Sequence, residues 1–234
     1  MAVIAMDIDG TVSTAGEWFA RLLANEFRLP LAEAALASIQ SSRQFWALPE
    51  VQALPAEQRQ AMRELALRYQ HDAEAQQNAV PMPDAVLALN QLAKQHTIVY
   101  TTCRRQESQQ GTQDWLARHG FPEPERVYCC PHYDWKYKYI EEIAEKSQKM
   151  KIVLFDDQAE MMVKAFRHLA KMDHRIALSL VLRLTLVAFG QAEPPAFPMR
   201  LPFPVLALPS WQEEDIAVLV SSSSSLQGNV PTVF

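Results

Sequence analysis

Two aspartates near the start of the chain are the first residues that could do chemistry. Asp7 and Asp9 follow the short apolar run 3–6, and Gly10 and Thr11 come directly after them. The apolar run predicts a buried strand, and residues two apart on an extended chain point to the same side. At about 5 Å and an effective dielectric of about 20, two such carboxylates repel by roughly 3 kcal/mol. A divalent cation offsets this repulsion, and oxygen-only ligands favour Mg²⁺.

A third polar position follows another apolar run. Residues 97–101 are β-branched and aromatic, which predicts a second buried strand. Thr102 stands at the end of this strand, and Cys103 and Arg104 follow it. Thr101 is the alternative hydroxyl at this strand end.

A lysine and a second acid pair complete the set. Lys136 and Lys138 lie at the start of a predicted helix, and Asp156 and Asp157 follow the predicted strand 151–155. Ligands of a parallel sheet bind beyond the carboxyl ends of its strands. Asp7, Thr102 and Asp156 all lie at such strand ends, so they are expected to meet at one edge of the sheet.

The order of these features resembles the haloacid dehalogenase (HAD) superfamily, which consists mainly of Mg²⁺-dependent phosphatases and phosphotransferases. Residues 7–12, with the sequence DIDGTV, match its first motif, and the threonine, the lysine and the second acid pair follow in the same order. The resemblance covers roughly residues 1–189. It implies an α/β fold, a Rossmann-like parallel sheet sandwiched by helices, with an inserted α-helical cap.

The resemblance also implies a division of labour between the first two acids. Asp7 would attack phosphorus to give an aspartyl-phosphate, which splits a difficult displacement into two easier ones. Asp9 would protonate the leaving oxygen and then activate water. A dehalogenase of the same superfamily does not need this second acid, so Asp9 favours phosphoryl transfer. The implied catalytic residues are Asp7, Asp9, Thr102 and Lys136.

Two sets of binding residues follow from the same resemblance. The implied Mg²⁺ ligands are Asp7, Asp9 through its backbone carbonyl, Asp156, and Asp157 either directly or through water. The implied phosphate- or substrate-binding residues are Gly10, Thr11, Thr102, Cys103, Arg104, Lys136 and Lys138. Between the two lysines, Lys136 is preferred, because it precedes Ile140 by four positions and so lies on the inward side of its helix. Lys138 stays open as the alternative.

The remaining elements are predicted from hydrophobic periodicity. Helical spacing without a strand signal runs from about residue 14 to residue 78, and strands alternate with helices from residue 81 onward, which predicts a parallel sheet covered on both faces. Helices are expected near 107–119, 137–146 and 160–171. We therefore expect a core from residues 1–13 and 80–220 and a helical C1 cap from residues 14–79.

The C-terminal part of the chain differs in composition, and little regular structure is predicted for it. Residues 182–189 predict the last strand, and the proline-rich stretch 191–209 predicts an irregular connection without an assigned role. Ser210 and Glu213 fit a capping box that starts a short helix. Residues 221–234, which begin with a serine run, predict a flexible tail.

Composition narrows the class of protein. The net charge of −5 disfavours nucleic acid as a partner, because tracking a phosphate backbone requires a basic face. Cys103, Cys129 and Cys130 are the only cysteines, a poor disulfide framework that fits a reducing compartment. The N-terminal apolar run is too short for a signal peptide, and no stretch is long enough to span a bilayer. We expect a cytoplasmic protein without membrane contacts.

The function that these residues and the resemblance imply is a Mg²⁺-dependent phosphatase acting on a small phosphomonoester. Three alternatives stay open: a phosphotransferase or mutase of the same superfamily, a nucleic-acid end phosphatase, and a non-catalytic binding protein that keeps the fold. The identity of the substrate depends on the geometry of the cap, and the sequence leaves it and the oligomeric state undefined.

Overall fold

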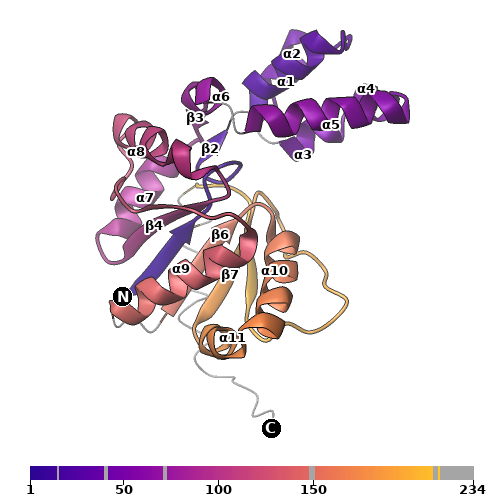
Figure 1. Ribbon diagram of the computed structural model, residues 1–234. Helices are drawn as coiled ribbons and strands as arrows, with labels where there is room; N and C mark the ends of the chain where they lie inside the picture. The colour runs from indigo at the N-terminus through magenta and orange to yellow at the C-terminus, as the bar shows by residue number, and fades with distance from the viewer. Residues whose placement is uncertain (15, 40–41, 71–72, 148–150, 213–215, 217–234) are drawn as a thin grey trace.

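A computed structural model describes the chain except for residues 15, 40–41, 71–72, 148–150, 213–215 and 217–234 (Figure 1). The predicted tail and Glu213 of the predicted capping box lie outside the described residues. Among the described helices, none has the length and hydropathy needed to cross a membrane.

A parallel sheet forms the centre of the molecule. Its strands, in spatial order, are β5 (Val127–Cys129), β4 (Thr97–Thr102), β1 (Ala2–Met6), β6 (Lys151–Asp156), β7 (Leu184–Phe189) and β8 (Val205–Leu208). The register aligns Met6 of β1 with Tyr100 of β4 and Phe155 of β6. The residues that follow Met6, Tyr100 and Phe155 therefore emerge together at the carboxyl edge of the sheet.

Helices cover both faces of the sheet, as the alternation of side chains along β1 requires. Ile4 and Met6 face a core that includes α7 (Ala85–Ala93) and α8 (Gln109–Arg118), which follows the short 3₁₀ turn Gln106–Ser108. Val3 and Ala5 face a second core on the opposite side. That core is built with α9 (Tyr133–Lys146), α10 (Ala159–Met172) and α11 (His174–Val181). The predicted α/β sandwich is confirmed.

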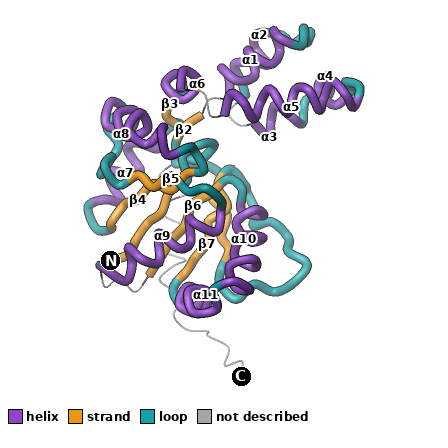
Figure 2. The backbone as a smooth tube through the Cα atoms, viewed as in Figure 1, coloured by secondary structure: helices purple, strands orange, loops and turns teal. Residues whose placement is uncertain are grey.

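The long insertion between β2 (Ser13–Thr14) and β3 (Val80–Pro81), which pair antiparallel, is helical. It contains α1 (Gly16–Glu26), α2 (Glu33–Ala37), α3 (Ser42–Trp46), α4 (Pro49–Gln52), α5 (Ala56–Gln70) and α6 (Ala73–Asn78). Helices α1 to α5 stand away from the sheet (Figure 2). They enclose a small core of their own, in which Leu23, Phe45 and Met62 are fully buried. The placement of the cap boundaries at residues 14 and 79 stays a prediction.

Helix α6 lies against the sheet-bearing part of the chain. The Gln77 side chain donates to the Gly111 carbonyl of α8 at 3.3 Å, and Arg118 of α8 donates to the Gln77 carbonyl at 3.2 Å. The indole of Trp115 donates to the Ala79 carbonyl at 2.9 Å. These bonds fix the returning end of the insertion to α8.

Several element predictions need correction. The last predicted strand begins at Leu184 rather than at residue 182, because α11 and a turn precede it. The stretch 191–209 is not irregular throughout: β8 extends the sheet beyond β7. Proline cannot donate to a ladder, but it is tolerated beside an edge strand, and Pro204 uses its carbonyl to accept from the Leu186 amide at 3.0 Å.

One helix prediction also differs from the structure. Helix α9 begins at Tyr133, four residues earlier than predicted, so both candidate lysines lie inside it. The helical spacing expected to reach about residue 78 corresponds at its end to α5 and α6, and residues 71–72 between them lie outside the described residues.

Candidate active site

Three carboxylates meet at the carboxyl edge of the sheet. Asp7 follows β1, Asp156 ends β6 and Asp157 comes next, and one oxygen from each lies within 4.8 Å of the others. The register brings them together, because Met6 pairs with Phe155 and the next residue of each strand is an aspartate. Asp7 and Asp156 are buried and Asp157 is partly buried.

A buried lysine binds two of these carboxylates. Nζ of Lys136 donates to Oδ1 of Asp7 at 2.6 Å and to Oδ2 of Asp156 at 2.8 Å, and the lysine is 1% exposed. Burial acts to lower the pKa of Lys136, but the two carboxylates outweigh it and raise that pKa well above its usual value. Lys138 instead holds its ammonium 4.7 Å from the ring centre of Trp135. Of the two candidate lysines, the structure brings Lys136 to the acids.

The acidic cluster holds three carboxyl groups against one lysine. Burial raises the pKa of Asp7 well above its usual value, and the repulsion of Asp156 and Asp157 adds to this. Burial followed by the charge of Asp156 raises the pKa of Asp157 to about 7. Carboxylates held close together in low dielectric resist ionisation unless a cation joins them. This donor set of carboxylate oxygens fits Mg²⁺.

The loop after β1 approaches Asp157 closely. Gly10 has a φ of +90°, and a Cβ atom at this position would lie 2.7 Å from Oδ2 of Asp157. A side chain would therefore meet both a steric clash and an unfavourable backbone conformation. The role of Gly10 in phosphate binding stays a prediction, and the structure shows that the loop needs glycine beside the acidic cluster.

Asp9 is paired with an arginine. The guanidinium of Arg104 donates through Nε to Oδ2 of Asp9 at 2.9 Å and through NH2 to Oδ1 at 2.5 Å. Arg104 also donates to the Thr112 hydroxyl at 3.1 Å, and that hydroxyl donates to the Ser108 carbonyl at 2.8 Å. Arg104, predicted to bind phosphate or substrate, is thus a buried partner of Asp9, while the Asp9 side chain is 36% exposed.

Three threonines surround the same edge. Thr102 is buried at the end of β4, and its hydroxyl accepts from the Arg104 amide at 3.2 Å. The hydroxyl oxygens of Thr11 and Thr101 are buried and have no hydrogen-bond partner among the described residues. Buried hydroxyls are normally satisfied, so the lack of a partner for these two is unusual.

Cys103, the last of the predicted binding residues, is half-buried beside the cluster. Burial raises the pKa of its thiol to about 11, with Lys136 opposing the shift. The thiol is therefore neutral at ordinary pH and can serve as a weak donor.

Sequence reasoning missed two neighbours of the site. Gln158 donates its backbone amide to Oδ1 of Asp156 at 2.8 Å and its side-chain amide to Oδ2 of Asp157 at 2.7 Å. A glutamine directly after an acid pair at a helix start could have indicated this. Trp211 donates its indole N–H to the Thr11 carbonyl at 2.8 Å. No local sequence pattern predicts a contact between residues 200 positions apart.

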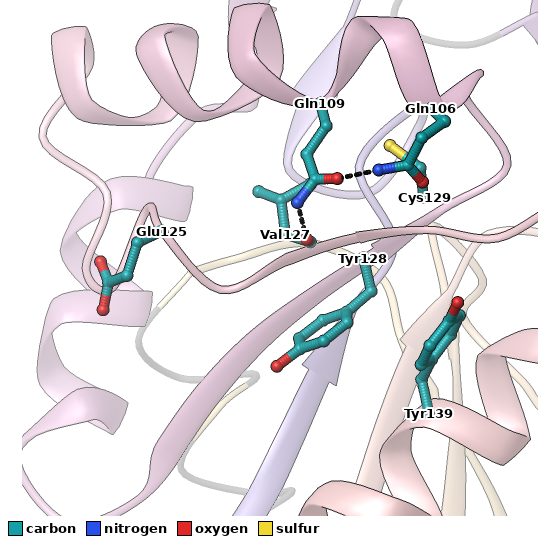
Figure 3. A pocket seen from close by; sticks show the side chains of 7 residues that line it. All are labelled: Gln106, Gln109, Glu125, Val127, Tyr128, Cys129 and Tyr139. Carbon is teal, nitrogen blue, oxygen red and sulfur yellow. Dashed lines mark hydrogen bonds between the residues drawn. The ribbon is translucent and has the colours of Figure 1, made fainter.

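A small cavity of about 180 Å³ lies beside the edge strand β5, lined by Gln106, Gln109, Glu125, Val127, Tyr128, Cys129 and Tyr139 (Figure 3). Its lining contains none of the clustered carboxylates. The Gln109 side chain bonds to Gln106 and donates to the Val127 carbonyl at 3.0 Å, so it covers part of the open edge of β5. The cavity is a feature of this edge and is separate from the acidic cluster.

No protein-family model and no curated protein sequence matches the chain. Solved structures do resemble it. A haloacid dehalogenase-like family hydrolase from Xanthomonas campestris has a TM-score of 0.53 at 12% identity, with 97% of this chain and 98% of that chain covered.

Two further solved structures have lower TM-scores. A HAD family hydrolase from Deinococcus radiodurans R1, solved with bound phosphate and sodium, has a TM-score of 0.47 at 14% identity, and the match covers 95% of this chain and 96% of that chain. A haloacid dehalogenase-like family protein from Streptococcus pneumoniae has a TM-score of 0.49 at 16% identity, covering 94% of this chain and 97% of that chain. At these identities the likeness concerns the fold.

Proposed function

Because the chain has the haloacid dehalogenase-like fold, we propose that it is a Mg²⁺-dependent phosphatase that hydrolyses a small phosphomonoester. The observation that carries the proposal is the buried contact of Lys136 with Asp7 and Asp156 at the carboxyl edge of the sheet. It combines a carboxylate nucleophile, a cation for the phosphoryl charge, and an acidic pair that can hold a metal.

Asp7 is the proposed nucleophile. Lys136 binds its Oδ1 atom, whereas Oδ2 makes no hydrogen bond to the described residues and is the atom that we expect to attack phosphorus. The phosphorus–oxygen bond of the ester breaks as the bond to Oδ2 forms, which gives an aspartyl-phosphate. Water then attacks the same phosphorus, releases phosphate and restores Asp7.

The metal would be held by Asp7, Asp156 and Asp157. Mg²⁺ supplies positive charge against the phosphoryl oxygens, and phosphoryl transfer depends mainly on such electrostatic stabilisation and on positioning. Lys136 contributes charge from the protein side. The buried hydroxyls of Thr11 and Thr101 and the strand-end Thr102 are candidates to bind the phosphoryl oxygens.

Asp9 is the proposed acid and base. It donates a proton to the leaving oxygen in the first step and removes a proton from water in the second. Its bidentate pairing with Arg104 occupies both carboxylate oxygens, so Asp9 must separate from the guanidinium before it can act as an acid. Binding of an anionic substrate, which competes for the guanidinium, is the step at which this separation would occur.

The helical insertion is the proposed cap. Helices α1 to α5 have their own core and are joined to the sheet-bearing part through β2 and β3. A cap of this kind excludes water from a site and selects the substrate. We therefore place the determinants of substrate identity on these helices.

The test is hydrolysis of a panel of aryl and alkyl phosphates by the full chain, in EDTA and in MgCl₂. Metal-dependent release of phosphate is the expected result, and Asp7→Asn is expected to abolish it. Asp114→Asn is the matched control, because Asp114 is an exposed aspartate on α8. Absence of metal-dependent turnover across the panel, or full activity of Asp7→Asn, would refute the proposal.

A further inference from the structure

The chain segment after β8 delivers a tryptophan to the loop that carries Asp9. Trp211 is 2% exposed, and its Nε1–H donates to the Thr11 carbonyl at 2.8 Å, across 200 positions of sequence. Thr11 is fully buried, so its carbonyl depends on this donor rather than on water.

The ring of Trp211 also supports the second acidic segment. It stacks on Phe189 of β7, with ring centres 4.9 Å apart, and lies 5.3 Å from the ring centre of Phe155. Phe155 directly precedes Asp156 on β6, and its carbonyl accepts from the Asp7 amide at 2.9 Å. One side chain thus contacts both segments from which the clustered carboxylates emerge.

The loop itself is tightly wound and leaves little room for adjustment. The Ile8 carbonyl accepts from the amides of Thr11, Val12 and Ser13 at 3.3, 3.1 and 2.9 Å. These bonds close the turn internally. The loop is connected to the rest of the fold by the bond from Trp211, by the bonds from Arg104 to Asp9, and by the bond from the Met82 amide to the Val12 carbonyl at 2.9 Å. Gly10 directly precedes Thr11, and a Cβ atom added to Gly10 would lie 2.7 Å from Oδ2 of Asp157.

We propose that Trp211 is a positioning residue for the metal and phosphoryl site. It fixes the loop of residues 8–12 against β6 and thereby sets the distances among the carboxylates. This inference rests on the proposed function, because Mg²⁺ is the ligand whose affinity it governs. A tryptophan that only filled the core would affect stability and leave the affinity of the folded protein for Mg²⁺ unchanged.

The test replaces the indole by a ring without a donor. Trp211→Phe keeps an aromatic ring and removes the N–H. Trp115→Phe is the matched control, because Trp115 is also buried and donates its indole N–H to a backbone carbonyl, that of Ala79, at 2.9 Å. Trp211→His, which retains an N–H in a smaller ring, is the rescue variant.

Three measurements on the full chain separate positioning from packing. Calorimetric titration with Mg²⁺ in the absence of substrate should show about tenfold weaker binding by Trp211→Phe, because the loop is no longer held in place and must be ordered when the metal binds. Hydrogen exchange of the amides of residues 10–13 should accelerate in the same variant. Turnover at saturating Mg²⁺ should fall less than turnover at limiting Mg²⁺. Trp115→Phe should lose thermal stability with no change in Mg²⁺ affinity or in the exchange of residues 10–13. Trp211→His should recover part of the Mg²⁺ affinity.

The outcomes distinguish this inference from the proposed function. If wild-type protein binds no Mg²⁺, the proposed function fails, and hydrogen exchange alone decides whether Trp211 holds the loop. If wild-type protein binds Mg²⁺ and Trp211→Phe binds it equally well with unchanged exchange, the inference is wrong. A measurement on the wild type covers the case of a variant that does not fold: the indole N–H signal of Trp211 must shift on addition of Mg²⁺, and a shift no larger than that of Trp115 overturns the inference.

Discussion

Removal of one negative charge from the acidic cluster should stabilise the metal-free protein. Burial and the neighbouring Asp156 raise the pKa of Asp157 from its ordinary 3.8 to about 7. The folded chain therefore resists the ionisation that the unfolded chain accepts. Asp157→Asn removes the charge, keeps the shape, and retains an oxygen to accept the 2.7 Å bond from the Gln158 side chain.

The sign and size of the effect follow from the two pKa values. Between pH 3.8 and about 7 the folded state binds more protons at Asp157 than the unfolded state does, so this group makes the wild type less stable as the pH rises through that window. The full penalty, about 4 kcal/mol at most, is present above pH 7. Partial exposure and relaxation of the neighbouring carboxylates reduce it to about 2 kcal/mol, which corresponds to roughly 4–8 °C in Tm for a chain of this size.

The assay is thermal unfolding in EDTA at pH 5 and at pH 8. Asp157→Asn should unfold at a higher temperature than the wild type at pH 8, and the difference should shrink at pH 5. Asp114→Asn is the matched control, because the carboxylate of Asp114 also accepts a bond from a glutamine side chain, that of Gln110, but is exposed. It should leave the Tm nearly unchanged at both values of pH.

Saturating Mg²⁺ should reverse the order of stability. The wild type gains stability in proportion to the logarithm of metal concentration over its dissociation constant, whereas Asp157→Asn lacks a ligand and gains much less. If Asp157→Asn is the less stable protein in EDTA at pH 8, or if its advantage is the same at pH 5, then burial of a repelled carboxylate is not the source of the effect.

Three further substitutions address the remaining parts of the site. Gly10→Ala should cost at least about 2 kcal/mol of stability through the clash with Asp157 and the positive φ, and calorimetry should show that Mg²⁺ binding is lost. Lys136→Met should lower the free energy of unfolding by about 3 kcal/mol in urea titrations, because it leaves two buried carboxylates without their cation. Lys138→Met should change the free energy of unfolding little, and equal losses in the two variants would contradict the assignment of Lys136. Asp9→Asn should reduce hydrolysis of alkyl phosphates about a thousandfold in steady-state assays, and that of nitrophenyl phosphate much less, because only the alkoxide needs a proton to leave; equal losses would argue against Asp9 as the acid.

The sequence was informative wherever a residue of the site directly follows a strand. Asp7 and Asp156 each come after a run of apolar residues, and parallel strands in adjacent register must bring such positions to one edge. Lys136 could be preferred over Lys138 because the helical period from Ile140 carries it inward. These predictions needed local periodicity, the rule that the carboxyl ends of strands form the site, and the family resemblance, which directed attention to a lysine in this helix.

The parts that could not be predicted depend on contacts between distant segments. The side chains of Arg104 and Asp9 could each have faced a ligand, and only the folded arrangement, with Thr112 behind the guanidinium, shows that they face each other. The apolar residues of β8 were hidden among prolines that usually indicate irregular structure. Trp211 carries no local signal at all, because its role depends on where β8 ends.

The position of β1 in the middle of the sheet has a consequence for the order of assembly. Its neighbours are β4 and β6, so Ala2 pairs with Lys151, and Val3 pairs with both Thr97 and Ile152. During synthesis β1 is therefore made well before its partner strands β4 and β6. Until those strands are made, its unpaired edges can pair with the wrong segment. Asp7 and Asp156 are thus kept apart until most of the chain has left the ribosome. Lys136 has been made by then, so the two acids begin to repel each other only when their cation is present.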